Sequence, residues 1–165
     1  MAQKYSFDVV SDVDFQEIDN ALNQARKEIM QRYDLKDFNT TIELNKADKT
    51  LLINSKDDYG VKASVDILQS KFIKRSISLK VMKPNEIEPA ANGRVKQLIN
   101  LQSGISKENA KMITKMIKEM NLKVNAQIMD EQVRVQGAKK DELQTVMANL
   151  KAADLDFPIQ FTNYK

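Results

Sequence analysis

The sequence predicts an α+β fold of two tandem ferredoxin-like α/β sandwiches, each with the element order β-α-β-β-α-β. Segments whose apolar residues recur with period two alternate with segments of helical period along the whole chain of 165 residues. The same order of segments occurs twice, on either side of a stretch that contains two prolines and a glycine. We therefore expect one domain over residues 1–83, a connector over 84–93 and a second domain over 94–165, and two such domains can exchange an edge strand.

The first unit begins with a strand over residues 5–10, in which Phe7 and Val9 share the apolar face. Asp12 and Asp14 are candidate N-caps for the helix that follows, because they precede an apolar run with helical spacing. The same reasoning predicts the rest of the unit: strands over 38–45 and 50–55 joined by a turn at 46–48, a helix capped by Asp57 or Asp58, and a strand over 77–81.

The second unit contains the most regular amphipathic helix of the chain, for which Ser106 is the expected N-cap. Five residues at helical spacing form its apolar face and are expected to be core: Met112, Ile113, Met116, Ile117 and Met120. The other elements of this unit are a strand over 95–101, a hairpin over 124–128 and 133–135 around a turn at Asp130 and Glu131, a helix from Asp141, and a strand over 159–164.

The opposite face of that helix carries a stripe of lysines. Between Arg94 and Lys123 there are seven basic and two acidic residues, a local net charge of +5, whereas the whole chain has a net charge of only +3. A solvated helix face is the plainer interpretation of such a stripe, and an accessory surface for an anionic ligand is the functional one. The accessory basic helix would present Lys107, Lys111, Lys115 and Lys118.

Composition excludes several classes of function. The chain has no cysteine and no histidine, which removes disulfides, thiol chemistry, histidine-based catalytic triads and histidine-containing zinc sites. No apolar run is long enough to span a bilayer, and the first residues lack the pattern of a secretion signal. We expect a cytoplasmic protein without a cofactor, a metal or a membrane association.

Three stretches resemble the bacterial YajQ family: SFDVVSDVDFQEIDNALNQARKEI, KENAKMITKMIKEMNLKVNAQI and DELQTVMANLKAADLDFPIQFTNYK. The resemblance covers essentially the whole chain and implies a small protein of two ferredoxin-like domains that binds nucleotides. GTP, RNA or tRNA, and cyclic di-GMP acting through partner transcription factors are the ligands that the resemblance implies. Ser76 and Lys140 depart from the pattern of the family, and a lysine cannot make the two-pronged contact that an arginine makes with phosphate or guanine.

The uncovered sheet face of the second unit is the expected nucleotide site, with the space between the domains as the alternative. Amide side chains suit base edges, and lysine and arginine suit phosphates. Arg134 is the leading candidate, and its replacement by alanine is expected to weaken binding without unfolding the protein. Only Tyr164 is available for stacking, which argues against an RNA-recognition motif that reads sequence. The full set is Arg94, Lys96, Asn125, Gln127, Arg134, Gln136, Gln160 and Tyr164.

Two further classes of function are alternatives to nucleotide binding. A protein-interaction adaptor that modulates a transcription factor or another partner would use the lysine helix or exposed leucines such as Leu52 and Leu98. An enzyme is not expected, because the four glycines are scattered and form no phosphate-binding loop. The sequence leaves the choice of ligand and the oligomeric state open.

Overall fold

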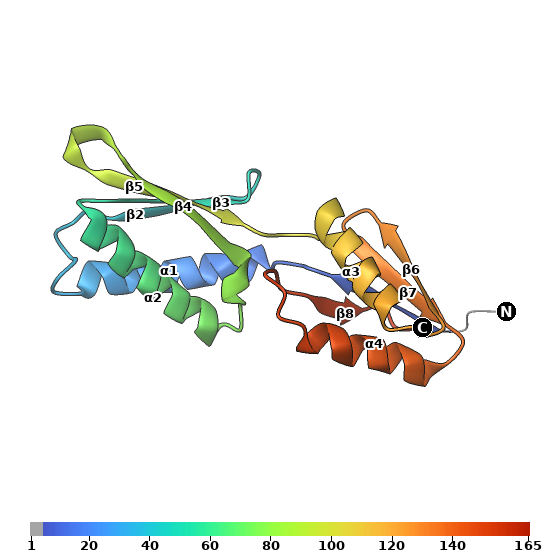
Figure 1. Ribbon diagram of the computed structural model, residues 1–165. Helices are drawn as coiled ribbons and strands as arrows, with labels where there is room; N and C mark the ends of the chain where they lie inside the picture. The colour runs from blue at the N-terminus through green and yellow to red at the C-terminus, as the bar shows by residue number, and fades with distance from the viewer. Residues whose placement is uncertain (1–4) are drawn as a thin grey trace. The chain divides into compact units, whose positions relative to one another are not determined.

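The computed structural model describes residues 5–165 as two compact units (Figure 1). One unit consists of residues 13–102 and is called the inserted domain here. The other combines the N-terminal segment up to residue 12 with residues 103–165 and is called the split domain. Each unit has two helices on one face of a four-stranded antiparallel sheet, which confirms the α+β class and the pair of ferredoxin-like sandwiches.

The inserted domain has the sheet order β2-β3-β5-β4, and every neighbouring pair is antiparallel. Helices α1 and α2 cover one face of this sheet (Figure 1). Its elements are α1 (Phe15–Gln31), β2 (Thr41–Asn45), β3 (Thr50–Ser55), α2 (Asp58–Lys74), the 3-10 turn η1 (Leu79–Val81), β4 (Met82–Pro89), the 3-10 turn η2 (Ala91–Gly93) and β5 (Val95–Leu101).

The split domain has the equivalent order β6-β7-β1-β8, again fully antiparallel. Helices α3 and α4 cover one face, and we call the other side the open face of the split domain. Its elements are β1 (Tyr5–Val10), α3 (Lys107–Glu119), β6 (Val124–Met129), β7 (Gln132–Gly137), α4 (Lys140–Ala152) and β8 (Gln160–Thr162).

The two domains exchange one strand each. Strand β1 precedes α1 in the chain but pairs with β7 and β8, whereas β5 precedes α3 and pairs with β3 and β4. The sequence allowed for the exchange of an edge strand, whereas the exchanged strands are interior ones. The compact units therefore divide the chain near residues 12 and 102, which differs from the expected division at 83 and 94. Most of the expected connector is β4, and the expected strand over 77–81 is largely the turn η1.

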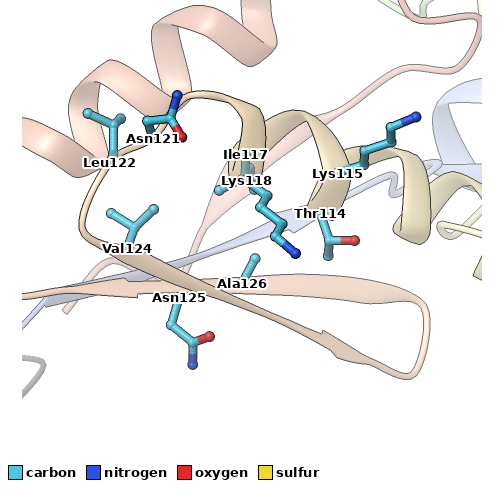
Figure 2. Close-up of a pocket in the computed structure, with 9 residues that line it drawn as sticks. All are labelled: Thr114, Lys115, Ile117, Lys118, Asn121, Leu122, Val124, Asn125 and Ala126. Carbon is cyan, nitrogen blue, oxygen red and sulfur yellow. The ribbon is translucent and has the colours of Figure 1, made fainter.

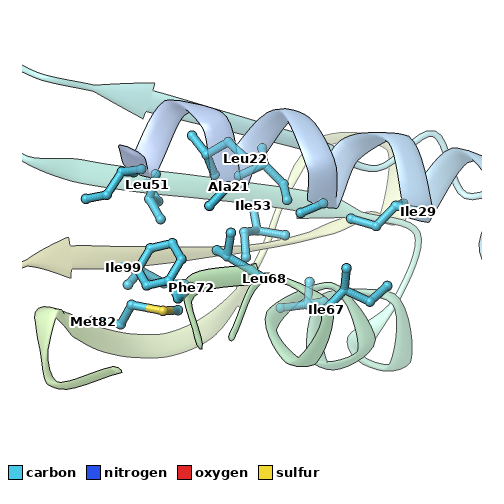
Figure 3. Close-up of a cluster of buried hydrophobic side chains, with 14 of the residues drawn as sticks. Ala21, Leu22, Ile29, Leu51, Ile53, Ile67, Leu68, Phe72, Met82 and Ile99 are labelled. Atoms are coloured by element: carbon cyan, nitrogen blue, oxygen red, sulfur yellow. The ribbon is translucent and has the colours of Figure 1, made fainter. Parts of the chain in front are cut away.

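Each domain has its own hydrophobic core. In the inserted domain, Leu22 of α1 and Phe72 of α2 pack with Leu51, Ile53 and Ile99 of the sheet (Figure 3). In the split domain, Phe7 and Val9 of β1 pack with Ile113 and Ile117 of α3. The sequence predicts that all four are buried, but it places the strand in the core of the first unit. Met112 is 42% exposed, so its expected core position was wrong, because it lies at the margin of the apolar face of α3.

Side-chain caps begin three of the four helices where the sequence predicts them. Asp14 accepts hydrogen bonds from the backbone N–H groups of Gln16 and Glu17 at 3.0 and 3.2 Å. Asp57 accepts from the N–H of Gly60 at 2.9 Å, and Ser106 caps α3. Each cap satisfies a backbone donor that the first helical turn leaves without an intrahelical partner.

Gly60 allows the first turn of α2 to approach β3. A Cβ atom at this position would lie 2.1 Å from Ser55 Oγ and 2.7 Å from a ring carbon of Phe38. We expect Gly60→Ala to lower the free energy of unfolding by about 1–3 kcal/mol in a urea titration, because the core must shift to accept the methyl group. Gly93→Asn is the matched control, since Gly93 has φ +72° and no atom within 4 Å of an added Cβ. Equal stability of Gly60→Ala and wild type would contradict the expected crowding.

Candidate functional site

The open face of the split domain presents polar side chains in cross-strand rows. One row joins Asn125 of β6, Gln136 of β7 and Ser6 of β1. The next row joins Gln127, Arg134, Asp8 and Thr162. The structure thus places four of the predicted site residues together: Asn125, Gln127, Arg134 and Gln136.

Arg134 is bound within the protein. Its Nε and Nη2 donate to the two carboxylate oxygens of Asp8 at 2.9 and 3.3 Å, and Asn163 Nδ2 donates to Asp8 Oδ2 at 3.0 Å. Asp8 is 3% exposed. The hydrogen bond from Arg134 holds the pKa of Asp8 below its ordinary value, and burial of the carboxyl opposes that shift only in part. The same hydrogen bond raises the pKa of Arg134.

This ion pair changes the assessment of the open face. The charge of Arg134 is neutralised by a carboxylate one strand away, and the rest of the two rows is uncharged. A phosphate group would have to compete with Asp8 for the guanidinium. Arg134 is therefore a structural residue of the sheet first, and its removal is a poor test of ligand binding.

Lys96 lies in β5 of the other sheet and Arg94 directly precedes that strand, so their expected grouping with Arg134 was wrong. The reason is the strand exchange, which places β5 in the inserted domain. Arg94 Nε donates to Asn54 Oδ1 at 2.7 Å, and its two terminal nitrogens donate to the carbonyl oxygens of Phe38 and Asn39 at 3.0 and 2.8 Å. Arg94 thereby fixes the loop that leads into β2.

The two remaining open-face predictions fall at β8. Gln160 lies opposite Val10, and its Oε1 accepts a hydrogen bond from the N–H of Asp12 at 2.8 Å. Asn163 has φ +57°, a left-handed conformation that shifts the alternation of side chains after β8. Tyr164 therefore faces the helix-covered side, with its ring 6.5 Å from that of Phe7, and its expected open-face position was wrong.

A pocket of about 490 Å³ lies where Tyr164 meets β1 and the first turns of α4. Tyr5 and Tyr164 are 37% and 62% exposed, so both rings are accessible to a ligand. Within residues 5–165, Lys140 and Lys165 form no side-chain ion pair. We call this the tyrosine pocket; it is lined by Tyr5, Ser6, Lys140, Leu143, Gln144, Met147, Tyr164 and Lys165.

Most residues of the tyrosine pocket were not predicted from the sequence. Lys140 and Gln144 are four residues apart, and helical spacing places them on one face of α4. Tyr5 belongs to the same strand face as Phe7 by period two. Both patterns are visible in the sequence, but no local sequence feature indicates that α4 and the end of β1 lie beside Tyr164.

A groove of about 690 Å³ runs between α3 and β6 (Figure 2). Two members of the lysine stripe line it, Lys115 and Lys118, and the side chain of Lys118 reaches toward the strand. Lys107 and Lys111 are exposed on α3 but do not line the groove. The structure therefore divides the predicted basic helix into two lysines at a groove and two on an open surface.

The most strongly shifted carboxyl belongs to Asp34 in the inserted domain. Hydrogen bonds from Arg32 and from the Tyr59 hydroxyl lower the pKa of Asp34 to about 2. Arg32 and Asp34 follow α1, and Tyr59 lies in the first turn of α2. The cluster ties the two helices together, so its shifted pKa has a structural cause.

Residues 5–165 contain neither a metal-binding cluster nor a membrane-spanning helix. No group of three or more aspartates and glutamates is arranged to hold a metal ion in this part of the chain. Among the helices of the described residues, none combines the length and the apolar character needed to cross a membrane.

Comparisons with known proteins agree on one family. A family model described as nucleotide-binding protein YajQ-like matches residues 5–165. A protein of Chloroherpeton thalassium named "Nucleotide-binding protein" is 54% identical over the full length of both chains. Proteins of the same name from Alkaliphilus oremlandii and Carboxydothermus hydrogenoformans are 52% and 50% identical, again over the whole of both chains.

Proposed function

The chain belongs to the YajQ-like family, and we propose that it binds a nucleotide in the tyrosine pocket of the split domain without hydrolysing it. The names of its relatives support nucleotide binding in general. One observation of the structure supports the location: two accessible tyrosine rings, two lysines and a glutamine line a single pocket. Its volume of about 490 Å³ lies within the range of small-molecule sites in proteins.

Each part of the pocket matches one part of a nucleotide. A base stacks on Tyr164 or Tyr5, since stacking on an aromatic ring contributes about 1–3 kcal/mol per base. The amide of Gln144 can both donate and accept a hydrogen bond at a base edge. The ammonium groups of Lys140 and Lys165 meet the phosphates as point charges. The open face has the amides but lacks an aromatic ring and an unpaired cation among the residues of its two rows.

Calorimetric titrations of GTP, cyclic di-GMP and a short single-stranded RNA at two salt concentrations identify the ligand. A strong loss of affinity with salt indicates several phosphate contacts and favours RNA. A stoichiometric signal that tolerates salt indicates a formed pocket for a small nucleotide. Absence of binding by all three would leave the adaptor function as the better explanation. Bound GTP is expected to be recovered intact.

Tyr164→Ala and Lys140→Ala are each expected to weaken binding about tenfold, because one removes the stacking ring and the other a phosphate contact. Tyr164→Phe should retain most of the affinity. Lys139→Ala is the matched control, since Lys139 is the exposed neighbour of Lys140 and does not line the pocket. If Lys139→Ala and Lys140→Ala bind equally well, the pocket is not the site.

The adaptor function has one structural observation in its favour. Leu52 and Leu98 lie directly opposite each other on the helix-free face of the inserted domain, and Leu98 is 40% exposed. A pair of adjacent apolar side chains is a better contact point than two isolated ones. An adaptor that responds to a bound nucleotide would combine both functions, and the cytoplasmic location expected from the sequence stays a prediction.

A further inference from the structure

Strand β6 is an open edge of the split-domain sheet, because β7 is its one partner in the order β6-β7-β1-β8. Met129 and Gln132 pair next to the two-residue turn. Hydrogen-bonded and non-hydrogen-bonded pairs alternate along an antiparallel ladder, starting from this hydrogen-bonded pair beside the turn. The backbone N–H and C=O groups of Val124, Ala126 and Ile128 therefore point away from β7. Such a row of backbone groups is a template for another extended segment.

The other three edge strands of residues 5–165 carry features that discourage pairing. Strand β4 contains Pro84 and Pro89 and a register shift, β2 carries Glu43, and β8 spans only three residues. Strand β6 has the sequence VNAQIM, six residues without a charge, a proline or a register shift. Charges, prolines, bulges and short length are the usual protections of a sheet edge. Strand β6 has none of them.

The groove between α3 and β6 supplies a boundary for a segment added to this edge. Ile117, Leu122 and Val124 form apolar parts of its lining, and Ala126 points from the strand toward the helix (Figure 2). Lys118 extends from α3 over the same space, and Lys115 lies at its rim (Figure 2). Neither lysine forms an ion pair with any residue of the described chain.

We propose that an extended, acidic segment of a partner protein docks on β6 and adds a fifth strand to the sheet. Its backbone pairs with the outward groups of Val124, Ala126 and Ile128. Every second side chain faces α3, where an aspartate or glutamate meets Lys115 or Lys118. This surface is separate from the tyrosine pocket and does not depend on nucleotide binding there.

The charges favour this occupant over a second copy of the chain. The β6 strand of another copy brings no carboxylate to the groove, and a symmetric pairing would bring two lysine helices together. A single-stranded nucleic acid would meet the lysines but has no extended amide backbone to pair with β6. Pairing of backbone groups is thus the property that separates the acidic segment from the other two occupants.

A fluorescein-labelled peptide of about ten residues, alternating glutamate and valine, tests the proposal by fluorescence anisotropy. We expect saturable binding that weakens about tenfold in Lys118→Glu and is unchanged in Lys107→Glu. Lys107 is the matched control because it belongs to the same stripe but lies outside the groove. Two methylated versions of the peptide carry N-methyl groups on alternate residues, one on the glutamates and the other on the valines. Each version keeps the charge of the peptide and loses half of its backbone N–H donors. At least one of the two methylated versions should bind more than tenfold more weakly than the unmethylated peptide.

Hydrogen exchange of the full protein gives an independent measurement. The amides of Val124, Ala126 and Ile128 should gain protection when the peptide is added, whereas those of Asn125 and Gln127 already face β7 and should change little. Equal binding by the methylated peptides would overturn strand addition. Binding of a short RNA through Lys118 without peptide binding would assign the groove to nucleic acid, and protected β6 amides in a dimer without peptide would assign it to a second copy.

Discussion

Replacing Arg134 with alanine is expected to destabilise the split domain more than replacing Asp8 with asparagine, although Asp8 is the more buried partner. Arg134→Ala leaves a carboxylate that is 3% exposed with Asn163 as its remaining side-chain partner. Asp8→Asn leaves Arg134, which is partly exposed and can be solvated. Breaking a buried pair from the cationic side leaves an uncompensated charge, so we expect the Tm of the split domain to fall by about 10 °C.

The stability of both variants should approach that of the wild type as the pH falls, for different reasons. In the wild type the pKa of Asp8 is lowered below 3.8, so its contribution to stability is present at neutral pH and is lost as the pH falls through the lowered value. Asp8→Asn lacks this contribution, so its deficit relative to wild type shrinks in acid. In Arg134→Ala, burial of the carboxyl without the guanidinium raises the pKa of Asp8, and protonation of this carboxyl in acid should relieve part of the destabilisation.

Thermal unfolding of wild type, both single variants and the double variant between pH 3 and pH 8 measures these effects. The double variant Asp8→Asn/Arg134→Ala should be more stable at neutral pH than Arg134→Ala alone, because no buried charge is left without a partner. If Arg134→Ala has the Tm of the wild type at neutral pH, the ion pair makes no net contribution. In that case the guanidinium is available to a ligand, and the open face becomes the better nucleotide site.

The fold class was predictable because it depends on local periods. The apolar spacing in α3 and the alternation in β6 and β7 are properties of short segments, and so are the caps Asp14, Asp57 and Ser106. The membership of β1 and β5 was not predictable in this way. Both have the alternation of a half-buried strand, and each fits the interior position of either sheet, because pairing partners lie far away in the sequence.

In the candidate site, too, the features set by local sequence were predictable and those set by distant residues were not. The rows of Asn125, Gln127, Gln136 and Arg134 were predicted, since a hairpin fixes which side chains share a face. The role of Arg134 was missed because Asp8 is 126 residues away in the chain. Tyr164 was assigned to the wrong face because one left-handed residue, Asn163, shifts the alternation after β8. A strand of three residues is too short for its apolar pattern to show that one residue after it adopts a left-handed conformation.

A second large effect is expected at Arg94, in the inserted domain. Its guanidinium donates to the side chain of Asn54 and to the carbonyl oxygens of Phe38 and Asn39, and so joins β3, β5 and the loop before β2. Arg94→Ala should lower the free energy of unfolding by about 2–4 kcal/mol, because hydrogen bonds from a charged donor each contribute about 1.5–3 kcal/mol and water replaces part of that loss.

Arg94→Lys should recover little of this stability, since one ammonium group cannot span three acceptors that a planar guanidinium reaches together. Urea titration gives the free energies, and faster hydrogen exchange of the amides at residues 39–42 would locate the change in the loop. Lys96→Ala is the matched control, because Lys96 lies in β5 only two residues after Arg94. Nucleotide affinity should be the same in all three variants. If Arg94→Lys is as stable as wild type but loses nucleotide binding, Arg94 is a ligand residue, and the tyrosine pocket is not the whole site.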